Sequence, residues 1–190
     1  MKSNYLKTIL LAAATITLFS FELPKGWFKA GSNPNDYEMG IDKNVQQNGT
    51  NAATIKSIKI GIDGFGTLMQ TCLPDKFFGE KVKMSGYIKS KDVAEWAGFW
   101  LRVDQNDGDQ PLAFDNMQDR AVKGTTDWKK YEIILDVPAN ATNIAYGALL
   151  SGEGQIWFDD IKFEIVDNAT PVTGDAGIPN SGPVNTDFEE

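Results

Sequence analysis

Histidine is absent from this sequence of 190 residues, and cysteine occurs once, at position 72. The lack of histidine removes the commonest general base, the usual base of a Ser-His-Asp triad and the commonest zinc ligand. One cysteine cannot form an internal disulfide, and because Cys72 lies in an apolar stretch we expect it to pack in the core. Triad hydrolases and zinc proteins are therefore disfavoured as function classes.

Basic residues are also scarce, since 18 Lys and Arg stand against 26 Asp and Glu, for a formal net charge of -8. Binding to nucleic acid or to an anionic membrane surface depends on clustered Lys and Arg, so neither is an expected partner. The acidic residues leave carboxylate-pair chemistry open, but they show no signature spacing. We therefore expect a protein that is not an enzyme.

A long apolar run occurs at the N-terminus, from Ile9 to Phe19, after Lys2 and Lys7. This layout is typical of a secretory signal peptide, and the run is shorter than the roughly 20 apolar residues that span a bilayer. No pair of small residues marks a cleavage site before Phe21, so an uncleaved membrane tether stays open. We expect residues 1–21 to be this signal or tether, and the protein to be secreted or extracytoplasmic, in the periplasm or at the cell surface.

Sustained helical periodicity is missing from the rest of the chain. Short β-branched and aromatic segments, separated by Gly, Asn, Asp and Pro, predict an all-β body of about nine strands. The segment "EKVKMSGYIKSK" alternates, with Val82 and Ile88 on its apolar face, and "TTDWKKYEIILDVP" places Ile133 and Leu135 in the same way. So many strands around one core predict two packed antiparallel sheets, a β-sandwich over residues 22–167.

The periodicity ends near Asp167. Residues 168–190 are rich in Pro, Gly, Asn, Thr and Asp, which is linker composition. We expect this segment to be a flexible linker or tail, and it stays open whether a further domain or a partner protein follows.

Three stretches carry a resemblance to a known family: "FELPKGW", "GTTDWKKYEIILDVP" and "GEGQIWFDDIKFEIV". Together they resemble the galactose-binding-domain-like, carbohydrate-binding jelly rolls of extracellular proteins, over roughly residues 20–167. The chain is also similar to the accessory domain of some arabinose-regulator-type transcription factors. It has no helix-turn-helix segment, so their regulatory role does not carry over. The resemblance implies a two-sheet jelly-roll β-sandwich that binds a ligand without catalysis.

The strand "AEWAGFWLRVDQ", residues 94–105, has both faces occupied. Its alternation sends Phe99, Leu101 and Val103 into the core. The opposite face carries Trp96, Trp100, Arg102 and Asp104 in one file. An indole offers a stacking plane for the C–H face of a sugar, and Arg and Asp form charge-assisted hydrogen bonds to hydroxyls. The alternative is structural: a Trp fills a hydrophobic corner, and Arg102 pairs with Asp104.

The neighbouring stretch "LAFDNMQDR" extends this candidate face with Asn116 and Gln118, whose amides are suited to hydroxyl groups. Turn and solvent roles are the alternative for both residues. The leading hypothesis is a non-catalytic module that binds a glycan, or another small ligand, through this face. The rival hypotheses are a sensor or protein-interaction module using the same face, and a structural spacer.

Asp159 shares a strand face with Trp157, Ile161 and Phe163. A carboxylate among apolar neighbours must be paired, protonated or bound to a metal, because an unpaired buried charge costs several kcal/mol. Related jelly rolls often hold a structural calcium ion here, and the resemblance implies Glu22 together with Asp159 or Asp160 as its side-chain ligands. A salt bridge or capping by backbone N–H groups is the alternative. We expect no organic cofactor.

Overall fold

The structure of the chain, a computed structural model, describes residues 21–106 and 110–176. Residues 1–20 of the expected signal or tether lie outside this part. No helix within it is long and apolar enough to cross a membrane. In chain order the elements are β1 (Phe28–Gly31), η1 (Pro34–Asp36, a 3-10 turn), β2 (Tyr37–Asp42), β3 (Ala52–Ser57), β4 (Phe65–Cys72), β5 (Glu80–Asp104), β6 (Ala113–Asp115), η2 (Gln118–Arg120, a 3-10 turn), β7 (Val122–Val137), β8 (Asn143–Ser151), β9 (Gln155–Val166) and β10 (Asp175–Ala176).

The long strand β5 belongs to both sheets of the fold. Its N-terminal half pairs with β7 and β9, and its C-terminal half pairs with β8 and β6. Between the halves the register of the β5–β7 ladder shifts on both sides of Val93, and Asp92 has a φ of 53°. Such a bulge bends a strand and increases its twist. It marks the place where β5 passes from one sheet to the other.

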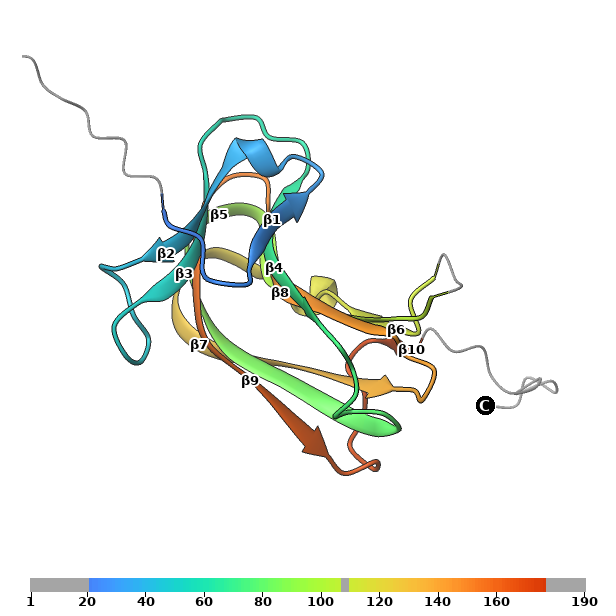
Figure 1. The fold of residues 1–190 in the computed structure, drawn as a ribbon. Helices are drawn as coiled ribbons and strands as arrows, with labels where there is room; N and C mark the ends of the chain where they lie inside the picture. Colours follow the sequence, from blue (N-terminus) through green and yellow to red (C-terminus); the bar gives the residue numbers. More distant parts are fainter. Residues whose placement is uncertain (1–20, 107–109, 177–190) are drawn as a thin grey trace, which may run out of the picture.

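Every strand pair in the fold is antiparallel. One sheet has the order β1-β4-β8-β5-β6-β10, and the other has the order β2-β3-β9-β5-β7. Figure 1 shows β6 and β10 together at one end of the molecule. This is the all-β, two-sheet jelly-roll sandwich that the sequence predicted.

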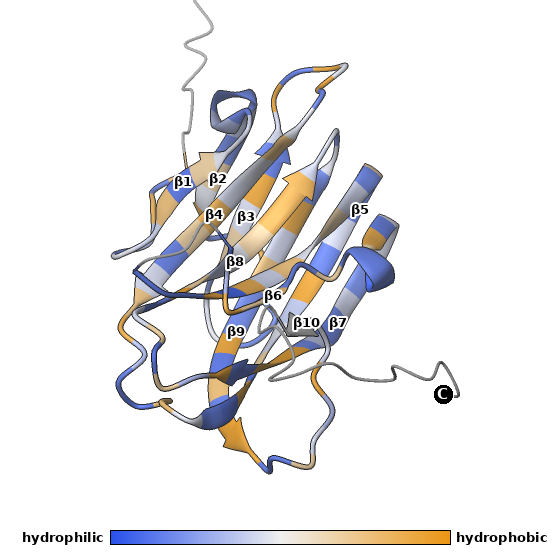
Figure 2. Ribbon diagram, turned by 90° about the vertical axis from the view of Figure 1, so that its right-hand side faces the viewer, coloured by the Kyte–Doolittle hydropathy of each residue, from blue (hydrophilic) through white to orange (hydrophobic). Residues whose placement is uncertain are grey.

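The core lies between the two sheets and confirms the predicted alternation. Most side chains expected to point inward are no more than 1% exposed, and the strands in Figure 2 alternate between hydrophobic and hydrophilic segments. Burial of each such side chain contributes about 1.5–3 kcal/mol. These residues are Val82, Met84 and Ile88, then Phe99, Leu101 and Val103, then Ile133, Leu135 and Val137. Tyr131, also expected to point inward, is only partly buried against this core. Cys72 is half-buried and packs against this core.

Lys81 departs from the predicted pattern, because it was expected on the outer face and is only 9% exposed. Its Nζ donates hydrogen bonds to the carbonyl oxygens of Asn168 (2.8 Å) and Thr170 (2.6 Å). A buried ammonium group needs such acceptors. The residues that supply them belong to the segment expected to be a flexible linker.

Residues 168–176, here called the C-terminal strap, pack against the sandwich. Thr173 N donates to Ile134 O of β7 at 2.9 Å, and β10 pairs with β6 with Asp175 opposite Phe114. The packed body therefore continues past the expected boundary at Asp167. The strap binds the sandwich through backbone hydrogen bonds and through the side chains of Lys81 and Thr173. A composition rich in Pro, Gly and Thr does not predict these contacts. The rest of the expected tail, residues 177–190, lies outside the described part.

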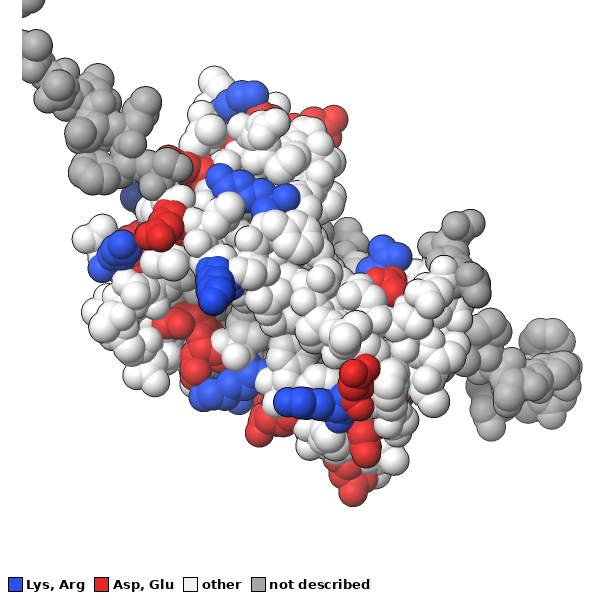
Figure 3. All heavy atoms as spheres, viewed as in Figure 1, with Lys and Arg blue, Asp and Glu red and all other residues white. Residues whose placement is uncertain are grey.

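Charged groups are mixed over the surface. On the face drawn in Figure 3, basic and acidic residues lie interspersed. Ion pairs of the described surface include Lys83 with Glu164 (3.1 Å) and Lys89 with Asp127 (3.0 Å). Exposed pairs of this kind contribute little to stability.

Candidate functional site

The face of the β1-β4-β8-β5-β6 sheet that points away from the core carries a cavity of about 690 Å³. Directly opposite residues of antiparallel strands share a face, so the predicted file on β5 lies beside alternate residues of β8 and β6. All the predicted ligand-binding residues except Gln118 line this cavity. They are Trp96, Trp100, Arg102, Asp104 and Asn116.

Trp100 forms the floor of the cavity and is only 9% exposed. It forms a small apolar cluster with Ala145 and Leu149, outside the main core. The indole Nε1 of Trp100 donates a hydrogen bond to Thr67 Oγ1 on β4 at 2.8 Å. Gly147 lies opposite Trp100 on β8, the strand between β5 and β4, so no side chain at that position hinders the indole. Trp100 therefore fits the structural alternative, in which a Trp fills a hydrophobic corner, although its ring still lines the cavity. Gly147 and Thr67 are distant in sequence, and strand alternation alone could not reveal them.

Trp96 is partly exposed and lies beside this floor, packed against the same cluster. It pairs across the ladder with Ser151, whose hydroxyl donates to Glu95 at 2.6 Å. Trp96 is therefore the indole that can offer a stacking plane to a ligand.

The polar end of the cavity is formed by Arg102, Asp104 and Asn143. Arg102 Nε donates to Asp104 Oδ1 at 2.5 Å, and Asn143 Nδ2 donates to Asp104 Oδ2 at 3.2 Å. The expected structural ion pair is thus present within the cavity. Because the pair uses Nε, the remaining guanidinium N–H groups can donate elsewhere, and 43% of the Arg102 side chain is exposed. The pair can therefore be structural and also face a ligand.

Sequence reasoning missed several residues of the cavity wall. Phe65, Thr67 and Met69 alternate along β4, Asn143 begins β8, and Phe114 lies opposite Arg102 on β6. Their two-residue spacing was a usable signal for a shared strand face. The pairing of β4 and β8 with β5 joins distant segments, and alternation within one strand does not predict it.

Gln118 lies outside the cavity, in an adjacent hollow of about 530 Å³ that also includes Asn116, Phe114 and Thr173. Asn116 Oδ1 accepts a hydrogen bond from Gln118 N at 3.1 Å, which is the turn role left open for Asn116. Asn116 and Phe114 line both spaces, so the cavity and the hollow share a wall.

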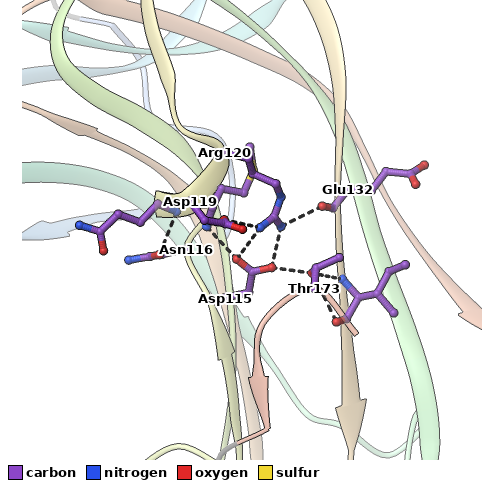
Figure 4. A network of polar contacts seen from close by, with 9 residues as sticks. Asp115, Asn116, Asp119, Arg120, Glu132 and Thr173 are labelled. Atoms are coloured by element: carbon purple, nitrogen blue, oxygen red, sulfur yellow. Dashed lines mark hydrogen bonds and ion pairs between the residues drawn. The ribbon is translucent and has the colours of Figure 1, made fainter. Parts of the chain in front are cut away.

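A buried carboxylate, Asp115, supports this wall (Figure 4). It accepts hydrogen bonds from Arg120 Nη2 at 2.6 Å, Met117 N at 2.7 Å and Thr173 Oγ1 at 2.5 Å. Burial acts to lower the pKa of Arg120, but its contacts with Asp115 and Asp119 outweigh burial and raise that pKa. The network joins β6, η2 and the strap, and it fixes the position of Asn116.

The residues implied as calcium ligands make other contacts. Glu22 is exposed and lies 3.6 Å from Lys43 Nζ, and Asp160 Oδ2 lies 3.0 Å from Lys162 Nζ. Asp159 accepts hydrogen bonds from the backbone N–H groups of Gln47 (3.2 Å), Asn48 (3.3 Å) and Asp160 (2.7 Å). Within the described residues, no three His, Cys, Asp or Glu side chains are grouped to hold a metal ion. This arrangement fits the alternative of a capped carboxylate, and calcium binding stays a prediction.

Comparison with known proteins shows similarity to parts of two larger proteins, and no family model matches the chain. The chain is 42% identical over 170 residues to the uncharacterized HTH-type transcriptional regulator YbfP of Bacillus subtilis (strain 168). The matched region covers 87% of this chain and 57% of that protein. It is also 30% identical over 156 residues to the tRNA(Glu)-specific nuclease WapA of Bacillus subtilis subsp. natto (strain BEST195). That match covers 76% of this chain and 6% of the nuclease. The chain thus spans little more than half of one relative and a small part of the other.

Solved structures share the fold at low sequence identity. The CBM22-1 xylan-binding domain of Paenibacillus barcinonensis Xyn10C aligns with a TM-score of 0.54 and 17% identity, over 80% of this chain and 92% of that domain. A cyclase from Fischerella sp. TAU, in complex with 4-(1H-indol-3-yl)butan-2-one, aligns with a TM-score of 0.57 and 15% identity, over 79% of this chain and 89% of the cyclase. The chain therefore has a jelly-roll fold like that of carbohydrate-binding modules.

Proposed function

We propose that this protein is a non-catalytic binding module that holds a carbohydrate in the cavity beside Trp96. The observation that carries the proposal is the combination, on one sheet face, of a partly exposed indole with the Arg102–Asp104 pair and the amides of Asn116 and Asn143. Sugars present apolar C–H faces and dense hydroxyl groups. A stacking plane bordered by a few directional polar groups is suited to both.

The xylan-binding domain with the same fold supports this proposal as a precedent for the architecture. The cavity lining does not fit one class of enzyme, the glycosidases. A glycosidase uses two carboxyl groups about 5–5.5 Å or 6.5–9.5 Å apart. Asp104 is the only acidic residue among those that line the described cavity, and it is paired with Arg102.

An extracytoplasmic location is part of the proposal and is supported by the sequence alone. Lys2 and Lys7 precede the apolar run from Ile9 to Phe19, which is the order found in export signals. Fractionation of cells that express the full chain, with mass measurement of the mature N-terminus, tests both export and cleavage.

The binding proposal is tested by calorimetric titration of the full chain with xylo-oligosaccharides and cello-oligosaccharides. We expect Trp96→Ala to weaken binding about tenfold or more, equivalent to at least about 1.4 kcal/mol. Trp128→Ala is the matched control, because Trp128 is also partly exposed but lies on β7, outside the cavity lining. Equal affinities for Trp96→Ala and the unchanged chain would overturn the assignment of this face.

A second candidate function is a ligand-sensing module. It is favoured by the 42% identity to a protein named as an HTH-type transcriptional regulator, of which this chain spans 57%. The resemblance to accessory domains of arabinose-regulator-type transcription factors points in the same direction. The same titration distinguishes the two candidates when it includes 4-(1H-indol-3-yl)butan-2-one, the small ligand of a cyclase with this fold. Binding of that compound together with no response to either sugar series would favour the sensor.

A further inference from the structure

The hollow that holds Gln118 lies directly beside the Trp96 cavity, because Phe114 and Asn116 line both. We propose that this hollow is a second subsite, and that the ligand is a chain of neutral sugar units running from the cavity over β6 into the hollow. This inference rests on the proposed carbohydrate-binding function and specifies its ligand class. Volumes of about 690 and 530 Å³ each lie in the range of small-molecule sites, roughly 300–1,000 Å³.

The C-terminal strap builds one wall of the hollow through Thr173 and Gly174. The position of Thr173 is fixed by two elements: its Oγ1 donates to Asp115 at 2.5 Å and accepts from Ile134 N at 2.8 Å (Figure 4). Gly174 lies so close to β6 that an added Cβ would be 2.3 Å from Phe114 O. The wall is therefore held against β6 at the place where the two spaces meet.

The two spaces offer different chemistry. The cavity is lined mainly by aromatic and aliphatic side chains, with Trp96 as the stacking surface. The hollow is lined by the amides of Asn116 and Gln118 and the carboxylate of Asp119, which is 75% exposed. Amide and carboxylate groups are suited to hydroxyl groups. One sugar unit of an oligosaccharide could thus stack on Trp96 in the cavity, while the next unit forms hydrogen bonds in the hollow.

Charge favours neutral sugar units. Arg102 in the cavity is paired with Asp104, and Arg120 beside the hollow is paired with both Asp115 and Asp119. Each cation therefore already has a carboxylate partner, which weakens its attraction for an acidic sugar. Asp119 in the open hollow would repel a uronic acid or a sulfated unit.

The test is a titration of the full chain with xylo-oligosaccharides of increasing length, from two to six units. We expect affinity to rise with length, and Gln118→Ala to weaken binding of the six-unit oligomer about three- to tenfold while changing binding of the two-unit oligomer less than twofold. Gln46→Ala is the matched control, because Gln46 is an exposed glutamine in the loop between β2 and β3. Gly174→Ala, which displaces the wall, should cause the same length-dependent loss, and its circular dichroism spectrum reports whether it folds.

The outcomes separate this inference from the proposed function. Binding of every length with equal affinity, or an equal loss for short and long oligomers in Gln118→Ala, would overturn the second subsite and leave the Trp96 cavity standing. No binding of either the xylo- or the cello-oligosaccharide series by the unchanged chain would instead count against the carbohydrate function itself. Tighter binding of glucuronic-acid-substituted xylo-oligosaccharides than of plain ones would overturn the preference for neutral units.

Discussion

Trp96 and Trp100 lie on the same face of β5 and have separate tasks. Trp100 packs under the cavity and donates to Thr67, whereas Trp96 is partly exposed above it. We expect Trp100→Phe to lower the free energy of unfolding by about 1–2 kcal/mol, through the lost hydrogen bond and the smaller ring. Trp96→Phe should lower it by less, about 0.5 kcal/mol, since the partly exposed indole of Trp96 loses less packing than the buried one of Trp100. Urea unfolding of both variants measures the difference, and equal losses would contradict the separation.

Tyr37 links two loops at the end of the sandwich beside the cavity. Its single hydroxyl hydrogen is shared between two acceptors, Gly64 O (3.1 Å) and Gly152 O (3.0 Å), and the residue is 2% exposed. Burial, with the nearby charges of Glu95 and Asp36, raises the pKa of Tyr37 to about 12.

This raised pKa predicts a pH dependence of stability. The unfolded chain releases the Tyr37 proton near pH 10, but the folded chain keeps it until about pH 12. The stabilisation of the folded chain that comes from protonated Tyr37 is therefore fully present below pH 10 and is lost as pH rises from 10 to 12. Unfolding free energies of the unchanged chain and of Tyr37→Phe, measured across that range, should converge with rising pH. Burial also raises the pKa of Tyr131 and Tyr146, so the variant should keep part of the decline. A constant difference between the two chains would exclude this linkage.

At the residue scale, alternation within a strand predicted which side chains leave the core. It placed Trp96, Arg102 and Asp104 on the cavity face, and the structure agrees. It could not predict how deeply each is buried, because Trp100 is covered by contacts that β8 and β4 supply. Burial depends on strand neighbours, and the period of one strand carries no information about them.

At the scale of elements, the sequence predicted separate strands around residues 80–91 and 94–105. The structure joins them into β5, with a bulge near Asp92. Thr125 holds this bulge from β7, since Asp92 N donates to Thr125 Oγ1 at 2.9 Å. Asp92 and Val93 lie between the two predicted strands in the sequence. The stabilising partner is distant along the chain, so the continuity could not be predicted.

The loop between β2 and β3 is held to β9 by Asp159. We expect Asp159→Ala to lower the free energy of unfolding by about 1–2 kcal/mol, because the N–H groups of Gln47 and Asn48 lose their acceptor. The loss should be the same with calcium and with a chelator if the carboxylate acts only as a cap. Asp75→Ala is the control, since Asp75 is an exposed aspartate in the loop between β4 and β5 and is not among the implied calcium ligands. A calcium-dependent gain in stability that disappears in Asp159→Ala would instead establish Asp159 as a metal ligand.

At the scale of the whole molecule, the C-terminal strap crosses from one sheet to the other. It contacts Lys81 and Ile134 in the β2-β3-β9-β5-β7 sheet, then Asp115 and Phe114 in the other sheet. Lys81 is 9% exposed and Asp115 is 6% exposed. Linker composition predicted a free tail here. Composition does not predict these contacts, because the two buried charged groups that receive the strap, Lys81 and Asp115, lie far upstream in ordinary strands.

This arrangement predicts that the strap is part of the stable domain. The free energy of unfolding of a chain that ends at Asp167 should be about 2–4 kcal/mol lower than that of a chain that ends at Ala176. Lys81 would lose both carbonyl acceptors, and Asp115 would lose Thr173. Urea unfolding of the two chains, followed by circular dichroism, measures the loss.

A second substitution separates buried charge from chain length. Lys81→Met should destabilise the chain ending at Ala176, because it removes two hydrogen bonds to the strap. In the chain ending at Asp167 the same change should have little effect, because Lys81 there has already lost both carbonyl acceptors and keeps only Asp136, 3.9 Å away. A loss of stability in the chain ending at Ala176, with little change in the chain ending at Asp167, would show that the strap stabilises the fold through Lys81. Equal stability of the two unsubstituted chains would show that the sandwich is complete at Asp167, as its composition first indicated.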